Sequence, residues 1–244
     1  MKYQLFRCGF DNRSFKAHFH TTYSIGFILR GVHNIKIENK NFSIKQGSIK
    51  IVNPYEIHIA NGKWEYINLM PKIKDLQSII TDIYEKEHKI RFDNEINDKN
   101  IVFLFKKLIN SSEKLEKDEN FIIFFSTLIK KHYSKSIKNF HYNINPSIEF
   151  IHSYFLKDIT IENIAKASNL SKYHFIRIFS KQTGITPYKY VLNLRLEYAR
   201  ELIKESYPLC EIAQITNFSD QSHFIKAFKN HFGFTPVEFR KYLM

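Results

Sequence analysis

A pattern that occurs twice between Thr160 and Arg240 constrains the fold more than any other feature of this sequence. Each copy has an apolar-periodic helix, a short polar break and a second helix that ends at a glycine. The first copy has Ile164-Ala165 in its first helix, a break from Asn169 to Ser171, and a second helix from Lys172 to Thr183 that ends at Gly184. The second copy has Ile212-Ala213, a break from Asn217 to Ser219, and a helix from about Asp220 to Phe232 that ends at Gly233. A helix, a short turn and a second helix form the unit that places its second helix in the major groove of DNA. The sequence therefore predicts two helix-turn-helix motifs, joined by a long helix that would set them one DNA turn apart, about 34 Å.

Residues suited to helix ends support these boundaries. Ser171, and either Ser219 or Asp220, can accept hydrogen bonds from the first turn of the helix that follows. The two closing glycines suit the left-handed conformation that ends a helix. The segment Thr235-Pro236-Val237-Glu238 has the spacing of a capping box. The helix starts and stops therefore agree with the repeated plan.

This repeat resembles the C-terminal domain of AraC/XylS-family transcription regulators. The resemblance rests on Ile164-Ala165, the closures Gly184 to Pro187 and Gly233 to Pro236, Arg195 with Leu196 and Ala199, and the block Ser222 to Lys229. One departure is Asn217, where the family usually has glycine. Because asparagine tolerates the left-handed region better than most residues, we expect the turn to be kept. The resemblance implies sequence-specific binding to double-stranded DNA.

Length and composition are consistent with two folded domains in 244 residues, of which 43% are hydrophobic and 25% are charged. Cys8 and Cys210 are too few for a disulfide framework or a zinc-finger spacing. The net charge of +13 suits a nucleic-acid partner, but most of the excess lies before Ile144, so the motif carries the prediction. No apolar run could span a bilayer, and the segment from Met1 to Leu5 lacks a signal peptide's apolar core. We therefore expect a cytoplasmic protein with no membrane contact.

The front of the chain predicts a different architecture. From Tyr3 to about Met70, short apolar or alternating segments are separated by turn residues such as Gly31 and Gly47. The predicted strands are 24–29, 34–38, 42–45, 49–52 and 64–69. Closely spaced antiparallel strands favour a small barrel that can enclose one ligand. Its pattern His-x-His…Gly…Gly…Asn-Pro-x-Glu-x-His resembles the cupin-type sensor domain of AraC-family regulators.

Polar residues of this barrel form the candidate effector site. His18 and His20 lie two apart on an extended segment and would point to the same side, facing His58. The full predicted set is His18, His20, Tyr23, Arg30, Glu56 and His58. Such a set would suit a polar or anionic small molecule. The alternative is that the histidines cap strand ends by bonding backbone carbonyls.

A metal-dependent cupin enzyme or a metal sensor is the alternative function. Three imidazoles can hold a divalent ion, and neutral histidine is a common metal ligand. However, Tyr23, Ser24 and Ile25 stand where cupin metal sites commonly have a glutamate. The sequence shows no other catalytic constellation. It therefore predicts an organic effector, with no metal, no cofactor and no enzymatic activity.

Helical periodicity follows the barrel. Apolar residues recur at intervals of three and four from Ile73 to Ile83, and two further helices are predicted from Asp98 to Leu115 and from Asp118 to Ser134. An excess of phenylalanine over what the barrel can cover predicts a dimer surface, the role of helices at this place in the family. We expect an effector-binding and dimerisation domain at 1–134, a linker at 135–145 and a DNA-binding domain at 146–244.

On the second helix of each motif the apolar positions must face inward, which leaves the other residues as candidate base contacts. These candidates are Lys172, Tyr173, Ile176, Arg177, Gln221, Ser222, Ile225 and Lys226, and the resemblance implies base contacts at all of them except Lys172. Arginine can grip guanine, glutamine can bond adenine and isoleucine can contact a thymine methyl group. The candidate phosphate contacts are Lys181, Lys189 and Lys229. Arg195 and Arg240 are expected to support the fold.

The sequence therefore predicts an α+β protein, with an N-terminal cupin-like β-barrel and trailing helices followed by an all-α domain with two helix-turn-helix motifs joined by a linker helix. The expected function is a sequence-specific transcription regulator controlled by a small-molecule effector. We expect a homodimer, with RNA polymerase as a further candidate partner. Activation is the role we assign, although a repressor would share these features.

Overall fold

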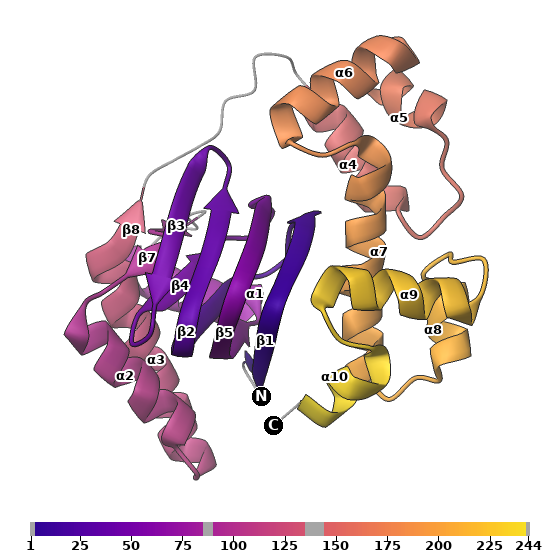
Figure 1. Ribbon diagram of the computed structural model, residues 1–244. Helices are drawn as coiled ribbons and strands as arrows, with labels where there is room; N and C mark the ends of the chain where they lie inside the picture. The colour runs from indigo at the N-terminus through magenta and orange to yellow at the C-terminus, as the bar shows by residue number, and fades with distance from the viewer. Residues whose placement is uncertain (1–2, 85–89, 135–143, 243–244) are drawn as a thin grey trace.

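The computed structural model describes residues 3–84, 90–134 and 144–242. Figure 1 shows a strand-rich part, covered on one side by helices, with a second, all-helical part along its other side. The chain is thus α+β, as predicted. Most of the predicted linker, at 135–143, lies outside the described residues.

The strand-rich part is built on one antiparallel sheet. Its strands are β1 (Tyr3–His18), β2 (Ser24–Ile37), β3 (Lys40–Lys45), β4 (Ile49–Val52), β5 (His58–Pro71) and β7 (Glu95–Ile96). Their order is β1-β5-β2-β4-β7, and β3 pairs with β2. A small second sheet pairs β6 (Arg91–Phe92) with β8 (Tyr133–Ser134).

The prediction of a closed barrel is wrong, because the sheet is open. β1 stands at one end of the strand order and pairs only with β5 among the described strands. Instead of closing the sheet, it packs against helices of the all-helical part, as Figure 1 shows. Covering the edge strand with helices is one way in which proteins keep it from pairing with other chains.

The strands are also longer than the sequence predicts. The segments 24–29 and 34–38 belong to the single strand β2, and β1 was not predicted as a strand. Gly31 lies inside β2 with φ 77°, where a Cβ atom would come within 2.1 Å of the Lys63 carbonyl oxygen. This glycine therefore permits a close approach of β2 and β5 and does not mark a turn.

Three helices cover one face of the sheet: α1 (Ile73–Tyr84), α2 (Lys99–Asn110) and α3 (Lys114–His132). Phe105 of α2 and Phe121, Phe124 and Phe125 of α3 are fully buried against that face. These phenylalanines therefore form the core of the sensor half, so they are not surplus to it.

The all-helical part contains α4 (Asn145–Tyr154), α5 (Ile161–Ala167), α6 (Lys172–Thr183), α7 (Pro187–Lys204), α8 (Leu209–Ile215), α9 (Gln221–Phe232) and α10 (Pro236–Tyr242). The predicted caps are present. Ser171 and Asp220 accept from the backbone amides of His174 and His223. Gly184 and Gly233 adopt the left-handed conformation, and Thr235 and Glu238 form the reciprocal bonds of a capping box.

Candidate functional site

Each helix-turn-helix motif contains a tight turn whose central asparagine adopts a left-handed conformation. Asn169, with φ 55°, lies between α5 and α6, and Asn217, with φ 56°, lies between α8 and α9. Asparagine enters this region more readily than most residues. The prediction that Asn217 preserves the second turn is confirmed.

Phenylalanines hold the second helix of each motif against its own core. Phe175 and Phe179 of α6, and Phe224 and Phe228 of α9, are fully buried. The opposite faces carry the residues predicted to contact bases: Ile225 is partly buried, and Lys172, Tyr173, Ile176, Arg177, Gln221, Ser222 and Lys226 are exposed. The predicted phosphate contacts Lys181, Lys189 and Lys229 are exposed as well. Both helices thus present a polar face that DNA can reach.

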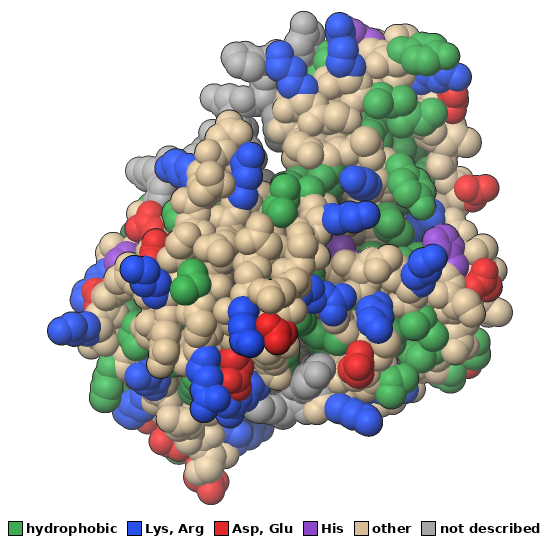
Figure 2. Space-filling view, viewed as in Figure 1, with side chains coloured by type: hydrophobic (Ala, Val, Ile, Leu, Met, Phe, Trp, Pro, Cys, Tyr) green, Lys and Arg blue, Asp and Glu red, His purple; other side chains and the backbone are tan. Residues whose placement is uncertain are grey.

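Positive charge alone does not mark these faces. In the view of Figure 2, Lys and Arg side chains are spread over both parts of the molecule. On α6, Lys172 forms an ion pair with Glu162 at 3.2 Å, and Arg177 lies 3.2 Å from Nδ1 of His174. Because both contacts are exposed, either cation can exchange its partner for a DNA group at little cost.

The long helix α7 separates the two motifs, as Figure 1 shows. Its 18 residues span about 27 Å at the rise of an α-helix. Arg195 donates to the backbone carbonyls of Phe155, Lys157 and Asn217, and Arg240 donates to those of Ile203 and Tyr207. The two arginines therefore join α7 to its neighbours, which confirms their predicted role in the fold.

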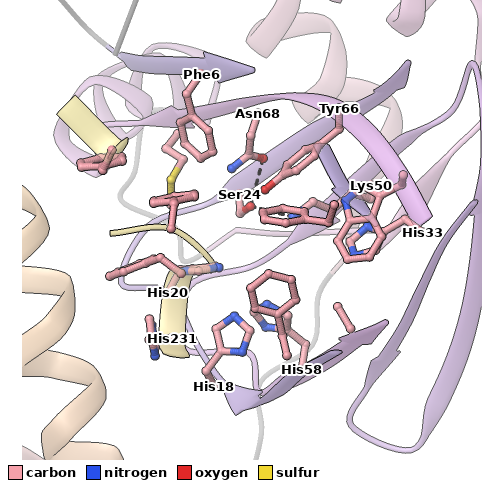
Figure 3. Close-up of a pocket in the computed structure, with 18 of the residues that line it drawn as sticks. Phe6, His18, His20, Ser24, His33, Lys50, His58, Tyr66, Asn68 and His231 are labelled. Atoms are coloured by element: carbon pink, nitrogen blue, oxygen red, sulfur yellow. Dashed lines mark hydrogen bonds between the residues drawn. The ribbon is translucent and has the colours of Figure 1, made fainter. Parts of the chain in front are cut away.

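A cavity of about 50 Å³ lies where the sheet meets the all-helical part. Figure 3 shows the side chains around it. The sheet contributes the three predicted histidines, Ser24, Lys50 and several aromatic rings, and the helices contribute Arg200, His231 and Phe232. A ligand in this cavity would therefore contact both parts of the molecule at once.

The His18-Phe19-His20 segment connects the cavity to the first motif. His18 and His20 both line the cavity, with ring centroids 5.1 Å apart. Phe19 points the other way and is fully buried among α4 to α7, with its ring 4.8 Å from that of Tyr190. Alternate residues of an extended segment point to opposite sides, so a displacement of the histidines would also displace Phe19.

Each of the three histidines has its Nδ1 atom in a hydrogen bond. Nδ1 of His18 bonds the Lys16 carbonyl at 2.7 Å, and Nδ1 of His58 bonds the Glu56 carbonyl at 3.0 Å. Nδ1 of His20 lies 2.8 Å from Oε1 of Glu197. Burial lowers the pKa of His18 and His58 well below the usual value, so these rings are neutral at pH 7.

Two residues that the sequence analysis missed complete this cluster from the all-helical part. Glu197 of α7 is buried and pairs with Arg200 at 2.9 Å, and His231 of α9 lies 3.8 Å from Glu197 Oε1. Burial raises the pKa of Glu197, but Arg200 and His20 outweigh that effect and hold the pKa well below its usual value. A signal was present: Asn193, Glu197 and Arg200 recur at intervals of four and three among apolar residues of α7, which puts them on one helix face.

Lys50 is buried at another side of the cavity. Its amine donates to Oγ of Ser24 at 2.7 Å, and Ser24 donates to Asn68 at 3.1 Å. Burial lowers the pKa of Lys50 to about 7. Among the described residues, no carboxylate forms an ion pair with this amine.

The structure does not bring Tyr23, Arg30 and Glu56 into this cavity. Tyr23 lies in the core and donates to the Ile90 carbonyl at 2.7 Å. Glu56 is buried in a polar network with Asn53, Asn94 and Arg91 that joins the loop after β4 to the segment around β6. Arg30 is largely exposed, with Glu65 at 3.9 Å. Only the histidines of the predicted effector set are therefore grouped together.

Arg30 lines a separate, open hollow of about 1040 Å³ over β1, β2 and β5. Its other polar residues include Arg7, Asn34, Lys63 and Glu65. Every residue that lines this hollow belongs to the strand-rich part. A ligand there would have no direct contact with the helix-turn-helix motifs.

The closing glycines place the end of each second helix against the sheet. A Cβ atom on Gly233 would lie 2.7 Å from the Phe15 ring, whereas one on Gly184 would lie 3.8 Å from Ile57. Arg13 of β1 adds hydrogen bonds to the carbonyls of Gly233 and Lys229. The sheet is therefore joined to the C-terminal end of α9, opposite the end that carries Gln221 and Ser222.

Two paired helix-turn-helix motifs beside a ligand-accessible sensor half define a DNA-binding transcription regulator with a ligand-binding domain. Comparison with known proteins agrees: an AraC-like ligand binding domain matches residues 5–120, and a helix-turn-helix domain matches residues 164–242. The chain belongs to the AraC family of transcription regulators.

Individual relatives support this assignment. The uncharacterized transcriptional regulator YbfI of Bacillus subtilis is 29% identical over 227 residues, which cover 86% of this chain and 82% of YbfI. The probable transcription factor PqrA of Proteus vulgaris is 40% identical over 84 residues, covering 34% of this chain and 69% of PqrA. A crystal structure of an apo ToxT variant from Vibrio cholerae has a TM-score of 0.70 at 15% identity, covering 100% of this chain and 98% of that one, which shows a shared fold. No described helix is long and apolar enough to cross a membrane.

Proposed function

We propose that a small ligand in the cavity between the two parts controls how the two helix-turn-helix motifs meet DNA. The observation that carries this proposal is that residues from β1, β2, β4, β5, α7 and α9 surround one cavity. A ligand shifts a conformational equilibrium only through contacts that differ between its states. A ligand that contacts both parts can bind more tightly to one arrangement of the parts than to another. A ligand in the open hollow around Arg30 would contact only one part.

The size of the cavity limits the ligand. One structure of ToxT contains an unsaturated fatty acid, but a cavity of about 50 Å³ is well below the roughly 300 to 1,000 Å³ of sites for drug-sized ligands. A fatty acid would need the two parts to separate. The cavity as it stands suits a ligand of a few heavy atoms.

For DNA contact we propose the roles predicted from the sequence. Arg177 and Gln221 would contact base edges from α6 and α9, together with the other exposed residues of those faces. Lys181, Lys189 and Lys229 would bind phosphates. The rigid α7 supports this proposal, since its length is comparable to one turn of DNA.

We also propose that the protein is a homodimer and has no enzymatic activity. Phe103 of α2, and Leu115, Ile122 and Ile123 of α3, are exposed apolar residues on the helices that cover the sheet. A second copy of the chain would cover them, and α2 and α3 would then belong to a dimerisation domain at 1–134. RNA polymerase is a further candidate partner of the DNA-bound protein. We propose the cytoplasm as its location.

Site selection from random DNA tests the proposed DNA contacts. The full chain should select two half-sites one turn apart, and Arg177→Ala should cost about 1 to 3 kcal/mol on the selected site while changing nonspecific binding little. Gln221→Ala should act in the same way on the other half-site, and Lys241→Ala, at the end of α10, is the control. Inserting about half a turn of DNA between the half-sites should abolish the gain in affinity that the second half-site provides. Selection of a single half-site, or equal losses on random DNA, would contradict the assignment of two base-contacting motifs.

A further inference from the structure

Three imidazole rings line the cavity, and the hydrogen bonds that they make indicate which nitrogen of each ring carries the proton. A backbone carbonyl can only accept a hydrogen bond, so Nδ1 of His18 and of His58 must carry the ring proton. The carboxylate of Glu197 likewise accepts from Nδ1 of His20. In a neutral imidazole the remaining nitrogen, Nε2, then holds an exposed lone pair.

These lone pairs lie close together. One ring nitrogen from each of His18, His20 and His58 lies within 4.8 Å of the others, and Figure 3 shows the three rings on the same side of the cavity. Among the described residues, no side chain donates a hydrogen bond to Nε2 of these rings. Protonating all three would bury like charges, which is costly. Neutral rings in this arrangement can instead direct their lone pairs at a metal ion between them.

We propose that His18, His20 and His58 bind a divalent transition-metal ion, with His231 as a further ligand from α9 and Glu197 as the residue that orients His20. This inference deepens the proposed function and rests on it, since it names the ligand of the cavity between the two parts. Imidazole is a common ligand of zinc, copper, iron and nickel. The ion would link the sensor sheet to the second helix-turn-helix motif.

The outer bonds of the rings favour an ion over an organic ligand. Metal-bound histidines usually donate their other N–H to a carbonyl or a carboxylate, which fixes the ring and raises its basicity. All three rings here make such a bond. A zinc ion bound at about 2.1 Å would hold nitrogens about 3.4 Å apart, and the ring nitrogens here all lie within 4.8 Å of one another. The volume of about 50 Å³ suits an ion and a few waters.

The all-helical part supplies a carboxylate and a further histidine beside the three histidines. The sequence favours an organic effector because no carboxylate follows His18-Phe19-His20, but Glu197 of α7 brings a carboxylate to His20 and orients that ring. Nε2 of His231 is buried and lies 3.8 Å from the Glu197 carboxylate, beyond hydrogen-bond distance. His20, Glu197 and His231 form a second group of possible ligands that shares His20 with the first. An ion can therefore contact both parts of the chain.

The test uses the full chain, purified without an affinity tag and freed of metal with a chelator. Titration with Co²⁺, followed by its visible absorption, and elemental analysis after zinc loading should both give one ion per chain. His18→Gln and His58→Gln should lose this stoichiometric binding. Glu197→Gln should weaken it by about 10- to 100-fold, the usual effect of removing a partner of a ligand. The matched control is His33→Gln, since His33 lines the same cavity and is buried but stacks on Trp64, outside the cluster.

X-ray absorption of the zinc-loaded wild type gives an answer even if a variant fails to fold. Three or four imidazoles around the ion would support the site. A spectrum with sulfur ligands, binding that survives His58→Gln, or the absence of binding would overturn it. None of these results would affect the DNA site selection, so the inference can fail while the proposed function stands. Conversely, a chain that holds one ion in this cluster but selects no bipartite DNA site would retain the metal site and lose the proposed DNA contacts.

Discussion

Lys50 is a buried basic residue of the cavity, and its protonation should affect stability. Burial lowers its pKa to about 7 in the folded chain, against about 10.4 when unfolded. Between these values the unfolded chain binds one proton more, so the free energy of unfolding rises with pH in this window. Below pH 7 both states hold the proton, and the full cost of burying the charge remains.

Replacing Lys50 by the similarly sized methionine should therefore stabilise the protein at pH 7, by about 2 to 4 kcal/mol. The gain should shrink as pH rises towards 10, because the buried lysine of the wild type is then neutral. Denaturant unfolding at several pH values measures this difference, with the exposed Lys63→Met as the control. A gain that stays constant from pH 7 to pH 10 would show that Lys50 is not buried as a neutral amine.

At the scale of elements, the ends of α6 and α9 differ in how closely they approach the sheet. Gly184 and Gly233 are both left-handed, so an alanine at either position costs about 1 kcal/mol from backbone strain. Only at Gly233 would the new methyl group collide with Phe10 and Phe15, at less than 3 Å. Gly233→Ala should therefore destabilise the protein by about 1 to 3 kcal/mol more than Gly184→Ala.

Thermal unfolding of the two variants compares them directly, since each serves as the control of the other. Equal losses of stability would mean that the end of α9 does not pack on β1 in solution. A larger loss for Gly184→Ala would point to the first motif as the more tightly held one.

The helices were largely predictable because their signals are local. Caps such as Asp220, closing glycines and apolar spacing lie within a few residues of the features that they specify. The strands were predicted less well, since the pairing of β1 with β5 joins residues such as Tyr3 and Pro71 that are far apart in the sequence. The open sheet was missed for the same reason: the helices that cover β1 come from the other end of the chain.

At the scale of the whole molecule, the site depended on contacts that no local pattern reveals. His20 and Glu197 are separated by 177 positions but share a hydrogen bond. Their meeting requires the sheet and α7 to pack together, which the sequence motifs of the two parts do not specify. The three histidines could be named from the sequence, and the spacing of Glu197 and Arg200 marks a polar face of α7, but no local pattern shows that this face meets the histidines.

The exposed apolar residues of α2 and α3 lead to a prediction about assembly. Phe103 is 62% exposed, and a charge there should weaken a dimer that covers it. Sedimentation of the full chain should show dimers for the wild type and mainly monomers for Phe103→Asp. Val237→Asp, at an apolar position of α10 that is 51% exposed, is the control in the other part. A monomeric wild type at tens of micromolar would contradict the proposed dimer.

The central claim is that contacts between the sensor sheet and the all-helical part set how the motifs bind DNA. Arg13 of β1 bonds the carbonyls of Gly233 and Lys229 at the end of α9 and is not itself a proposed DNA contact. Lys63 of β5 is exposed and pairs with Asp11 in its own part. The deciding measurement is the affinity of Arg13→Ala and Lys63→Ala for the selected DNA site at one salt concentration, because each variant removes one positive charge. The account predicts a change of about fivefold or more for Arg13→Ala, in the range of allosteric coupling, and none for Lys63→Ala. Unchanged affinity in both variants would show that the two parts bind their ligands independently.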